Sequence, residues 1–149
     1  MTEVRFYHLT RSTLDTALPQ ILTKALERDM RALVVTPSKE VTQHLNDVLW
    51  RFDEMSFLPH GTEKEGDADH QPIWISESLD NQNQAQLLTL VEGVEAEEID
   101  SYEMVCYFFN GLDEEALGKA RNYWKVLKEK NRDLSYWQQT DRGAWKQKM

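Results

Sequence analysis

The residues best suited to recognition chemistry lie near the end of the chain, in residues 119–149. This segment holds nine Lys or Arg residues against three Asp or Glu residues, a charge of +6, whereas the whole chain carries −9. Trp124, Trp137 and Trp145 lie among these cations. Aromatic surface beside Arg and Lys suits a ligand that is both apolar and anionic, such as an acidic peptide end with a large side chain. The segment therefore favours a binding function over a catalytic one.

A helix from Asp113 to about Lys130 is expected to position these groups. Asn110-Gly111 is a turn signal, Asp113 can cap a helix, and acidic residues early with basic residues late complement the helix dipole. Helical spacing predicts an apolar stripe formed by Leu117, Ala120, Trp124 and Leu127. It also predicts an adjoining basic stripe formed by Arg121, Lys125 and Lys128. In the alternative interpretation, Trp124 belongs to the core and the basic stripe is a solvated face.

Hydrophobic periodicity predicts the elements that precede this helix. Strands are expected at residues 4–9, 31–36, 57–59, 72–76, 87–91 and 104–109, and helices at residues 14–27 and 37–50. Pro19 would move the start of the first helix to about Leu18 if it occupies the first turn. Residues 61–71 are expected to form a loop, and residues 92–100 an acidic, solvated segment. The order of these elements predicts an α/β fold over residues 1–149, one domain with a mostly parallel sheet flanked by helices and a basic helix near its C-terminal end.

Catalytic, nucleotide and metal sites are not predicted. The turns after the first two strands, residues 10–13 and 36–39, lack the glycines that let a backbone approach phosphate. The four histidines, His8, His44, His60 and His70, show no close pairing, and Cys106 lies in an apolar run typical of a buried thiol. No local nucleophile signature is present. We therefore expect no cofactor, whereas a nucleophile and its base could still meet in the folded protein.

Charge and hydropathy restrict the setting of the chain. It has neither an export signal nor an apolar run of the length that spans a membrane, so a cytoplasmic location is expected. The net charge of −9 opposes broad contact with bare DNA or RNA, because like charge repels the phosphate backbone.

Several motifs resemble the chi subunit family of bacterial DNA polymerase III. The end of the chain carries Ala120-Arg121-x-x-Trp124-Lys125-x-x-Lys128, then Leu134-x-Tyr136-Trp137-Gln138-Gln139 and Gly143-Ala144-Trp145-Lys146. Leu49-Trp50, followed by Phe57-Leu58-Pro59-His60, is similar to the family's Leu-Trp…Phe-x-Pro-His element, and Phe6-Tyr7-x-Leu9 fits the family's opening strand. The resemblance extends over essentially the whole chain. One departure is Trp124, where some members have tyrosine.

This resemblance implies a non-catalytic accessory subunit of the clamp-loader complex with a Rossmann-like α/β fold. Family members bind the acidic C-terminal tail of single-stranded DNA-binding protein, which ends in Pro-Phe. Arg121 and Lys125 would meet the terminal carboxylate and neighbouring acidic groups, Trp124 would form a wall of the phenylalanine pocket, and Lys128 and Lys146 are further candidates. The family's second surface binds the psi subunit, and the matching positions here are Trp50, Phe57 and Pro59. Sheet-edge packing is the alternative role for these three residues.

Two other functions are considered beside the adaptor. The basic, Trp-bearing end could bind single-stranded nucleic acid directly, with bases stacked on exposed indoles. The α/β scaffold could also belong to a small-molecule enzyme, which would need a deep polar pocket at the ends of the strands.

Overall fold

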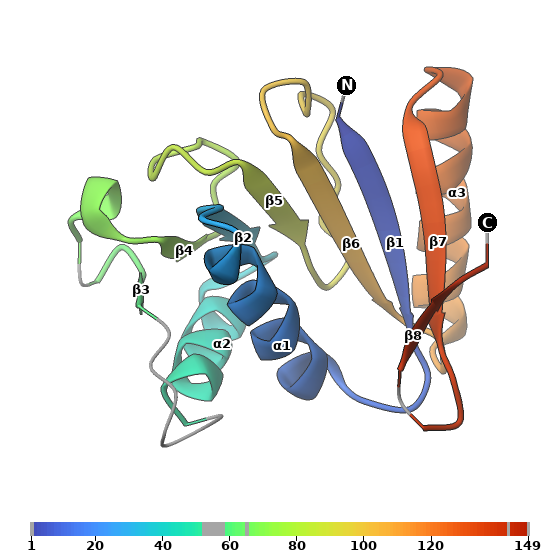
Figure 1. Ribbon diagram of the computed structural model, residues 1–149, viewed down its shortest axis with the longest axis horizontal. Helices are drawn as coiled ribbons and strands as arrows, with labels where there is room; N and C mark the ends of the chain where they lie inside the picture. The colour runs from blue at the N-terminus through green and yellow to red at the C-terminus, as the bar shows by residue number, and fades with distance from the viewer. Residues whose placement is uncertain (1, 52–58, 65, 143, 149) are drawn as a thin grey trace.

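The computed structural model describes residues 2–51, 59–64, 66–142 and 144–148. They form one eight-stranded sheet with three α-helices and a short 3-10 helix (Figure 1). Along the chain the elements are β1 (Glu3–Leu9), α1 (Leu14–Glu27), β2 (Ala32–Val35), α2 (Lys39–Arg51), β3 (His60–Gly61), η1 (Ala68–His70), β4 (Ile73–Ser76), β5 (Leu87–Leu90), β6 (Met104–Asn110), α3 (Glu114–Glu129), β7 (Asp133–Gln139) and β8 (Trp145–Gln147).

The sheet is parallel except at one edge. Its strand order is β3-β4-β2-β5-β6-β1-β7-β8, and only β8 runs antiparallel to its neighbour, β7. The first strand of the chain therefore lies inside the sheet, between β6 and β7. The predicted α/β fold with a mostly parallel sheet is confirmed.

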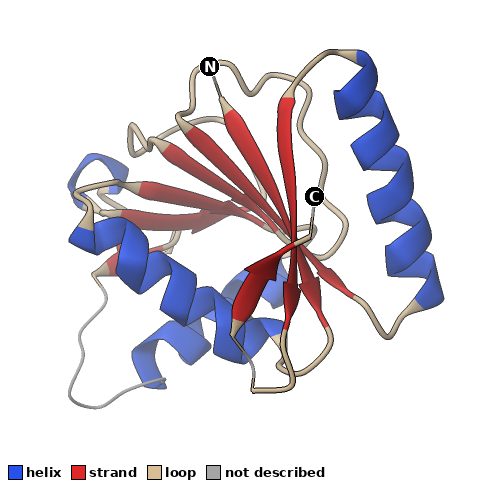
Figure 2. Ribbon diagram, turned by 45° about the vertical axis from the view of Figure 1, so that its right-hand side comes forward, coloured by secondary structure: helices blue, strands red, loops and turns tan. Residues whose placement is uncertain are grey.

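The helices cover the two faces unequally. Helices α1 and α2 pack on one face and α3 packs alone on the other (Figures 1 and 2). Strand residues alternate between the two layers, so Phe6 of β1 packs toward α3 while Tyr7 packs toward the face of α1. All four residues of β2 are buried, as expected of a strand covered on both faces.

Most predicted elements are confirmed, and two expectations for the first half of the chain need correction. Helix α1 begins at Leu14 with Pro19 inside it, so the proposed later start is wrong; Pro19 lies in the second turn, where its missing N–H removes a single bond of the helix. Residues 61–71 are not only a loop, because Gly61 pairs with Trp74 in the sheet and η1 lies within them. The short strand expected at residues 57–59 lies mostly outside the described residues, and β3 begins at His60.

The end of the chain differs most from expectation. Helix α3 occupies the predicted span, but strands β7 and β8 follow it, and neither strand was predicted. The basic segment therefore consists of a helix and a strand pair. None of the helices described is long and apolar enough to cross a bilayer.

Candidate functional site

Helix α3 begins at the predicted cap. The side chain of Asp113 accepts a hydrogen bond from the backbone N–H of Glu115 at 3.0 Å, and Glu114 and Glu115 occupy the first turn. Lys128 lies in the last turn, where a positive charge is favourable. The helix is thereby stabilised at both ends independently of its packing.

The buried face of α3 overlaps the predicted apolar stripe but contains Tyr123 in place of Trp124. Ala120, Tyr123 and Leu127 are buried, whereas Trp124 is only half-buried. The hydroxyl of Tyr123 donates to the carbonyl of Ala96 at 2.7 Å, which satisfies its polar atom inside the core. Tyr123 was not singled out from the sequence, and Trp124 lies at the border of the core.

Aromatic rings from two strands hold Trp124 at this border. Its ring meets Phe6 of β1 edge-on with 5.1 Å between centroids, and Tyr136 of β7 edge-on with 6.2 Å between centroids. Such edge-to-face pairs are favourable and directional. Trp124 therefore presents a fixed indole beside β7, with part of its surface open to solvent.

The predicted basic stripe lies on the β7 side of α3. Arg121, Lys125 and Lys128 are exposed, and at about 100° per residue they follow Trp124 around the helix, away from the buried centre. Because Trp124 contacts β7, the stripe borders the same strand. The helix therefore brings together an indole edge, a guanidinium and two ammonium groups, as expected from the spacing.

Tyr136 connects this stripe to the sheet. Burial raises the pKa of Tyr136, while its hydrogen bond with Gln138 and the nearby charge of Arg121 lower it. The Tyr136 hydroxyl also forms a hydrogen bond with His8 Nδ1, and the His8 ring stacks on Phe109 with 4.9 Å between centroids. Strands β1, β6 and β7 thus fix the floor beneath the basic stripe.

Lys146 approaches the same face from the sheet edge. In the register of β7 and β8, Lys146 lies opposite Gln138, whose side chain is bonded to His8 at 3.2 Å. Trp145, the preceding residue, packs into the layer of α1, so alternation along the strand places Lys146 on the α3 face. The structure therefore places Lys146 on the face that carries the basic stripe.

Trp137 and Trp145 do not belong to this face. Both pack against Tyr7 on the opposite side of the sheet, with centroid distances of 6.3 Å and 4.9 Å. Grouping the three tryptophans in one site, as the sequence suggested, is therefore wrong. Their separation follows from the period of two along a strand, and β7 and β8 were not predicted.

The second predicted surface is described only in part. Trp50, at the end of α2, is 52% exposed, and its ring lies 4.6 Å from the ring of His60. Pro59 is half-buried, and Phe57 lies outside the described residues. An exposed indole therefore lies beside the start of β3, the edge strand at the far end of the sheet from α3.

A cavity lies at the carboxyl ends of the strands, but two backbone N–H groups at its rim that could bind phosphate are already hydrogen-bonded. A cavity of about 570 Å³ opens beyond the carboxyl ends of β1 and β6, where parallel α/β proteins often bind ligands. At its rim the side-chain carbonyl of Gln139 accepts hydrogen bonds from the backbone N–H groups of Arg11 at 3.0 Å and Ser12 at 3.1 Å. These donors, at the entrance to α1, are thus occupied by a side chain of β7.

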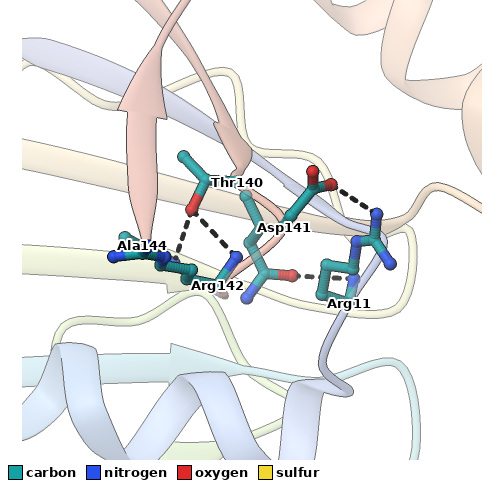
Figure 3. A network of polar contacts seen from close by, with 6 residues as sticks. Arg11, Thr140, Asp141, Arg142 and Ala144 are labelled. Atoms are coloured by element: carbon teal, nitrogen blue, oxygen red, sulfur yellow. Dashed lines mark hydrogen bonds and ion pairs between the residues drawn. The ribbon is translucent and has the colours of Figure 1, made fainter.

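The loop between β1 and α1 is held to the end of β7 by an ion pair. Arg11 donates to Asp141 at 2.6 Å, and the Thr140 hydroxyl accepts from the backbone N–H groups of Arg142 and Ala144 (Figure 3). The β7–β8 turn is therefore structured by its own side chains and by the β1–α1 loop. Among the residues that the structure describes, no three potential metal ligands cluster.

Comparison with known proteins identifies relatives of the chain. Residues 1–135 match the family model for the DNA polymerase III chi subunit, HolC. A curated relative named probable DNA polymerase III subunit chi, from Rickettsia prowazekii (strain Madrid E), is 25% identical over 91 residues, which are 61% of this chain and 55% of the relative. The chain thus spans about half the length of this relative.

Proposed function

The chain belongs to the DNA polymerase III chi subunit family, and from this premise we propose that it is a non-catalytic adaptor of the polymerase. In this role it folds as one domain and binds the acidic C-terminal tail of single-stranded DNA-binding protein. It thereby tethers the replicase to coated DNA without making or breaking a bond.

The observation that carries this proposal is the border between α3 and β7. Trp124 is fixed there between apolar rings, and the exposed cations Arg121, Lys125 and Lys128 follow it along the helix. Lys146 lies on the same face of the sheet. A peptide that ends in an aromatic residue and a free carboxylate, with acidic residues before it, complements both the indole and the charges.

Each residue has a separate role in this proposal. Arg121 lies near the Tyr136 hydroxyl and can hold the terminal carboxylate through two parallel hydrogen bonds. Trp124 packs against the terminal phenylalanine, and burying that ring contributes roughly 1.5–3 kcal/mol that salt does not screen. Lys125, Lys128 and Lys146 attract the preceding acidic side chains, a contribution that salt weakens.

Tethering does not require tight binding by one tail. A DNA strand coated with many copies of the partner presents many tails, so the local concentration of tails is high. Modest affinity then suffices, and rapid release of any one tail lets the polymerase move.

The test is a titration with a fluorescent peptide ending in Asp-Ile-Pro-Phe. Arg121→Ala and Trp124→Ala proteins should each bind at least about tenfold more weakly, since a charged hydrogen bond or a large apolar contact is worth roughly 1.5–3 kcal/mol. Because Trp124 also touches Phe6, its variant is first checked for an unchanged far-ultraviolet spectrum.

Lys119→Ala is the matched control. Lys119 is exposed on the same helix but pairs with Glu115 at 3.9 Å, on the side away from Trp124. The Lys119→Ala substitution removes one positive charge, as Arg121→Ala does, and should leave the affinity for the peptide within about twofold of that of the unmodified protein. Equal losses for both variants, or equal binding of a peptide lacking the final phenylalanine, would refute the assigned site.

The psi subunit, or an equivalent clamp-loader component, is proposed to bind at Trp50 together with Phe57 and Pro59. The exposed indole of Trp50 supports this proposal, because large exposed aromatic residues are enriched at interfaces. Trp50→Ala should abolish co-elution with the psi subunit and leave tail binding unchanged. Retained co-elution would exclude Trp50 from the interface.

A further inference from the structure

A second groove lies on the face of the sheet opposite to α3. It has a volume of about 500 Å³ and runs between α1 and the β7–β8 strand pair, over the strands β1 and β6. In Figures 1 and 2, α1 lies over one part of this face and β8 lies at its edge. The groove shares no lining residue with the basic stripe of α3.

Aromatic rings form one wall of the groove. Trp145 meets Tyr7 edge-on at 4.9 Å between centroids, and Trp137 lies nearly parallel to Tyr7 at 6.3 Å. The guanidinium of Arg5 lies 5.0 Å from the centre of the Trp137 ring, and Arg5 also pairs with Glu3 at 2.8 Å. Both indoles are half-buried, so each keeps part of its surface accessible.

Polar and cationic side chains of α1 form the facing wall. Gln20, Lys24 and Arg28 all line the groove and are exposed. Gln20 and Lys24 lie one turn apart on α1, at an interval of about 6 Å, and Arg28, the C-cap residue after Glu27, follows Lys24 on the same side. Neither Lys24 nor Arg28 takes part in the ion pairs found among the described residues.

The lining has a consistent sign of charge in a chain that is acidic overall. Arg5, Lys24 and Arg28 line the groove, and no Asp or Glu does so among the described residues, although Glu3 beside the groove offsets the charge of Arg5. The whole chain carries −9. A local concentration of cations beside accessible indoles is the arrangement that binds single-stranded nucleic acid, in which bases stack on aromatic rings and the backbone follows a basic groove.

We propose that this groove binds a short stretch of single-stranded DNA, about two or three nucleotides long. Bases stack against Trp145 and Trp137, and successive phosphates meet Lys24 and Arg28, whose interval along α1 is close to that between phosphates in an extended strand. The two accessible indoles beside these cations favour a nucleic acid over an acidic peptide, because successive bases can stack on them. Repulsion by the acidic remainder of the chain keeps the affinity low.

The inference is independent of tail binding, because its residues lie on the other face. It also differs from the site suggested by the sequence, which contained only the basic, Trp-bearing end of the chain. Lys24 comes from the first helix and Arg28 from its C-cap, and both approach the two indoles only in the folded protein.

The test uses tryptophan fluorescence with an oligothymidylate of about six nucleotides, which is longer than the stretch that the groove is proposed to hold. The oligonucleotide should quench fluorescence, and Trp145→Phe should remove much of the quenching. Since single strands release about 0.7 counterion per neutralised phosphate, two contacts predict a roughly sevenfold loss of affinity between about 50 and about 200 mM salt. The Lys24→Gln/Arg28→Gln protein should bind at least fivefold more weakly and lose most of this salt dependence.

A matched control distinguishes binding in the groove from attraction by the net charge of the protein. The Lys39→Gln/Arg51→Gln protein makes the same change in net charge through exposed residues of α2, outside the groove, and should bind like the unmodified protein. Equal weakening of both double variants would overturn the proposal, because it would show only long-range attraction.

Three further results would also overturn it. Loss of oligonucleotide binding in an Arg121→Ala/Lys125→Ala protein would move the site to α3. Binding of thymidine monophosphate as tight as that of the oligonucleotide would exclude a strand that follows the helix. Displacement of the oligonucleotide by an equal concentration of hexa-aspartate would identify a peptide site. Tail-peptide binding, measured on the same proteins, should remain unchanged in the groove variants.

Discussion

Replacing Gly111 by alanine should destabilise the protein strongly, although it adds a single methyl group. Gly111 follows β6, and its N–H donates to the carbonyl of Leu9 at 2.8 Å, which ties the end of β6 to the end of β1. A Cβ atom at this position would overlap the ring of His8 and lie 3.0 Å from the Leu9 carbonyl oxygen. The glycine is therefore required by close approach of a side chain and not by its backbone angles.

The size of the stability loss follows from the contacts that hold His8 in place. Its ring stacks on Phe109 and is bonded to the Tyr136 hydroxyl, so it cannot swing away without losing both contacts. Overpacking costs about 1–3 kcal/mol and a lost hydrogen bond about 1 kcal/mol. A total of about 2–4 kcal/mol corresponds to a fall in melting temperature of roughly 5–15 °C for a chain of this length.

Gly118→Ala is the matched control for this measurement. Gly118 lies inside α3, and a Cβ atom there would have no heavy atom within 4 Å. The substitution should stabilise the protein by about 0.5–1 kcal/mol, because alanine restricts the unfolded chain and favours the helix. Urea and thermal unfolding followed by circular dichroism measure both variants. A Gly111→Ala protein as stable as the unmodified one would refute the reasoning, as would equal losses for both alanines.

Three other perturbations have outcomes fixed by burial. Burial lowers the pKa of His8, so below about pH 6.5 the unfolded chain binds this proton more readily and the free energy of unfolding falls as the pH drops. A His8→Asn protein should lose that part of the pH dependence in urea unfolding between about pH 5 and pH 7, and an unchanged slope would contradict the assignment. Burial also raises the pKa of the Cys106 thiol to about 12, so a thiol reagent should label the protein only in denaturant. Rapid labelling of the folded protein would show that the thiol is accessible. Asn83→Ala should lower the free energy of unfolding by about 1–3 kcal/mol, because the buried Asn83 amide donates to the carbonyls of Ala32 at 2.9 Å and Gln71 at 3.0 Å. A stability loss below about 0.5 kcal/mol would count against these bonds.

The interior of the sheet could be predicted from the sequence because its strands are covered on both faces. Ala32–Val35 is apolar at every position, and Leu14–Glu27 repeats its apolar residues at helical intervals. The structure of such segments can be predicted from the pattern of their own residues. The edge of the sheet could not be predicted in this way, since Asp133–Gln139 is mostly half-buried and mixes polar with aromatic residues.

The candidate site was predictable in composition but not in its geometry. Arg121, Lys125 and Trp124 do lie side by side on α3, because i, i+3 and i, i+4 spacings are properties of any helix. The sequence alone did not indicate that Tyr123 and not Trp124 faces the core, since the two residues are neighbours and both are aromatic. That choice depends on how α3 rests on β1 and β6, which is a property of the folded chain.

The position of β1 inside the sheet has a consequence for the order in which the chain can fold. Its partners are β6 and β7, which lie about a hundred residues and more downstream, so β1 is synthesised before the other strands of this sheet and is among the last to acquire both neighbours. Contacts between such distant segments carry a large loop-closure cost and slow the folding reaction. Until residues 133–139 have been synthesised, the backbone of β1 exposes unpaired hydrogen-bonding groups that could associate with other nascent chains. During translation, the vulnerable edge of this protein is therefore its amino-terminal strand.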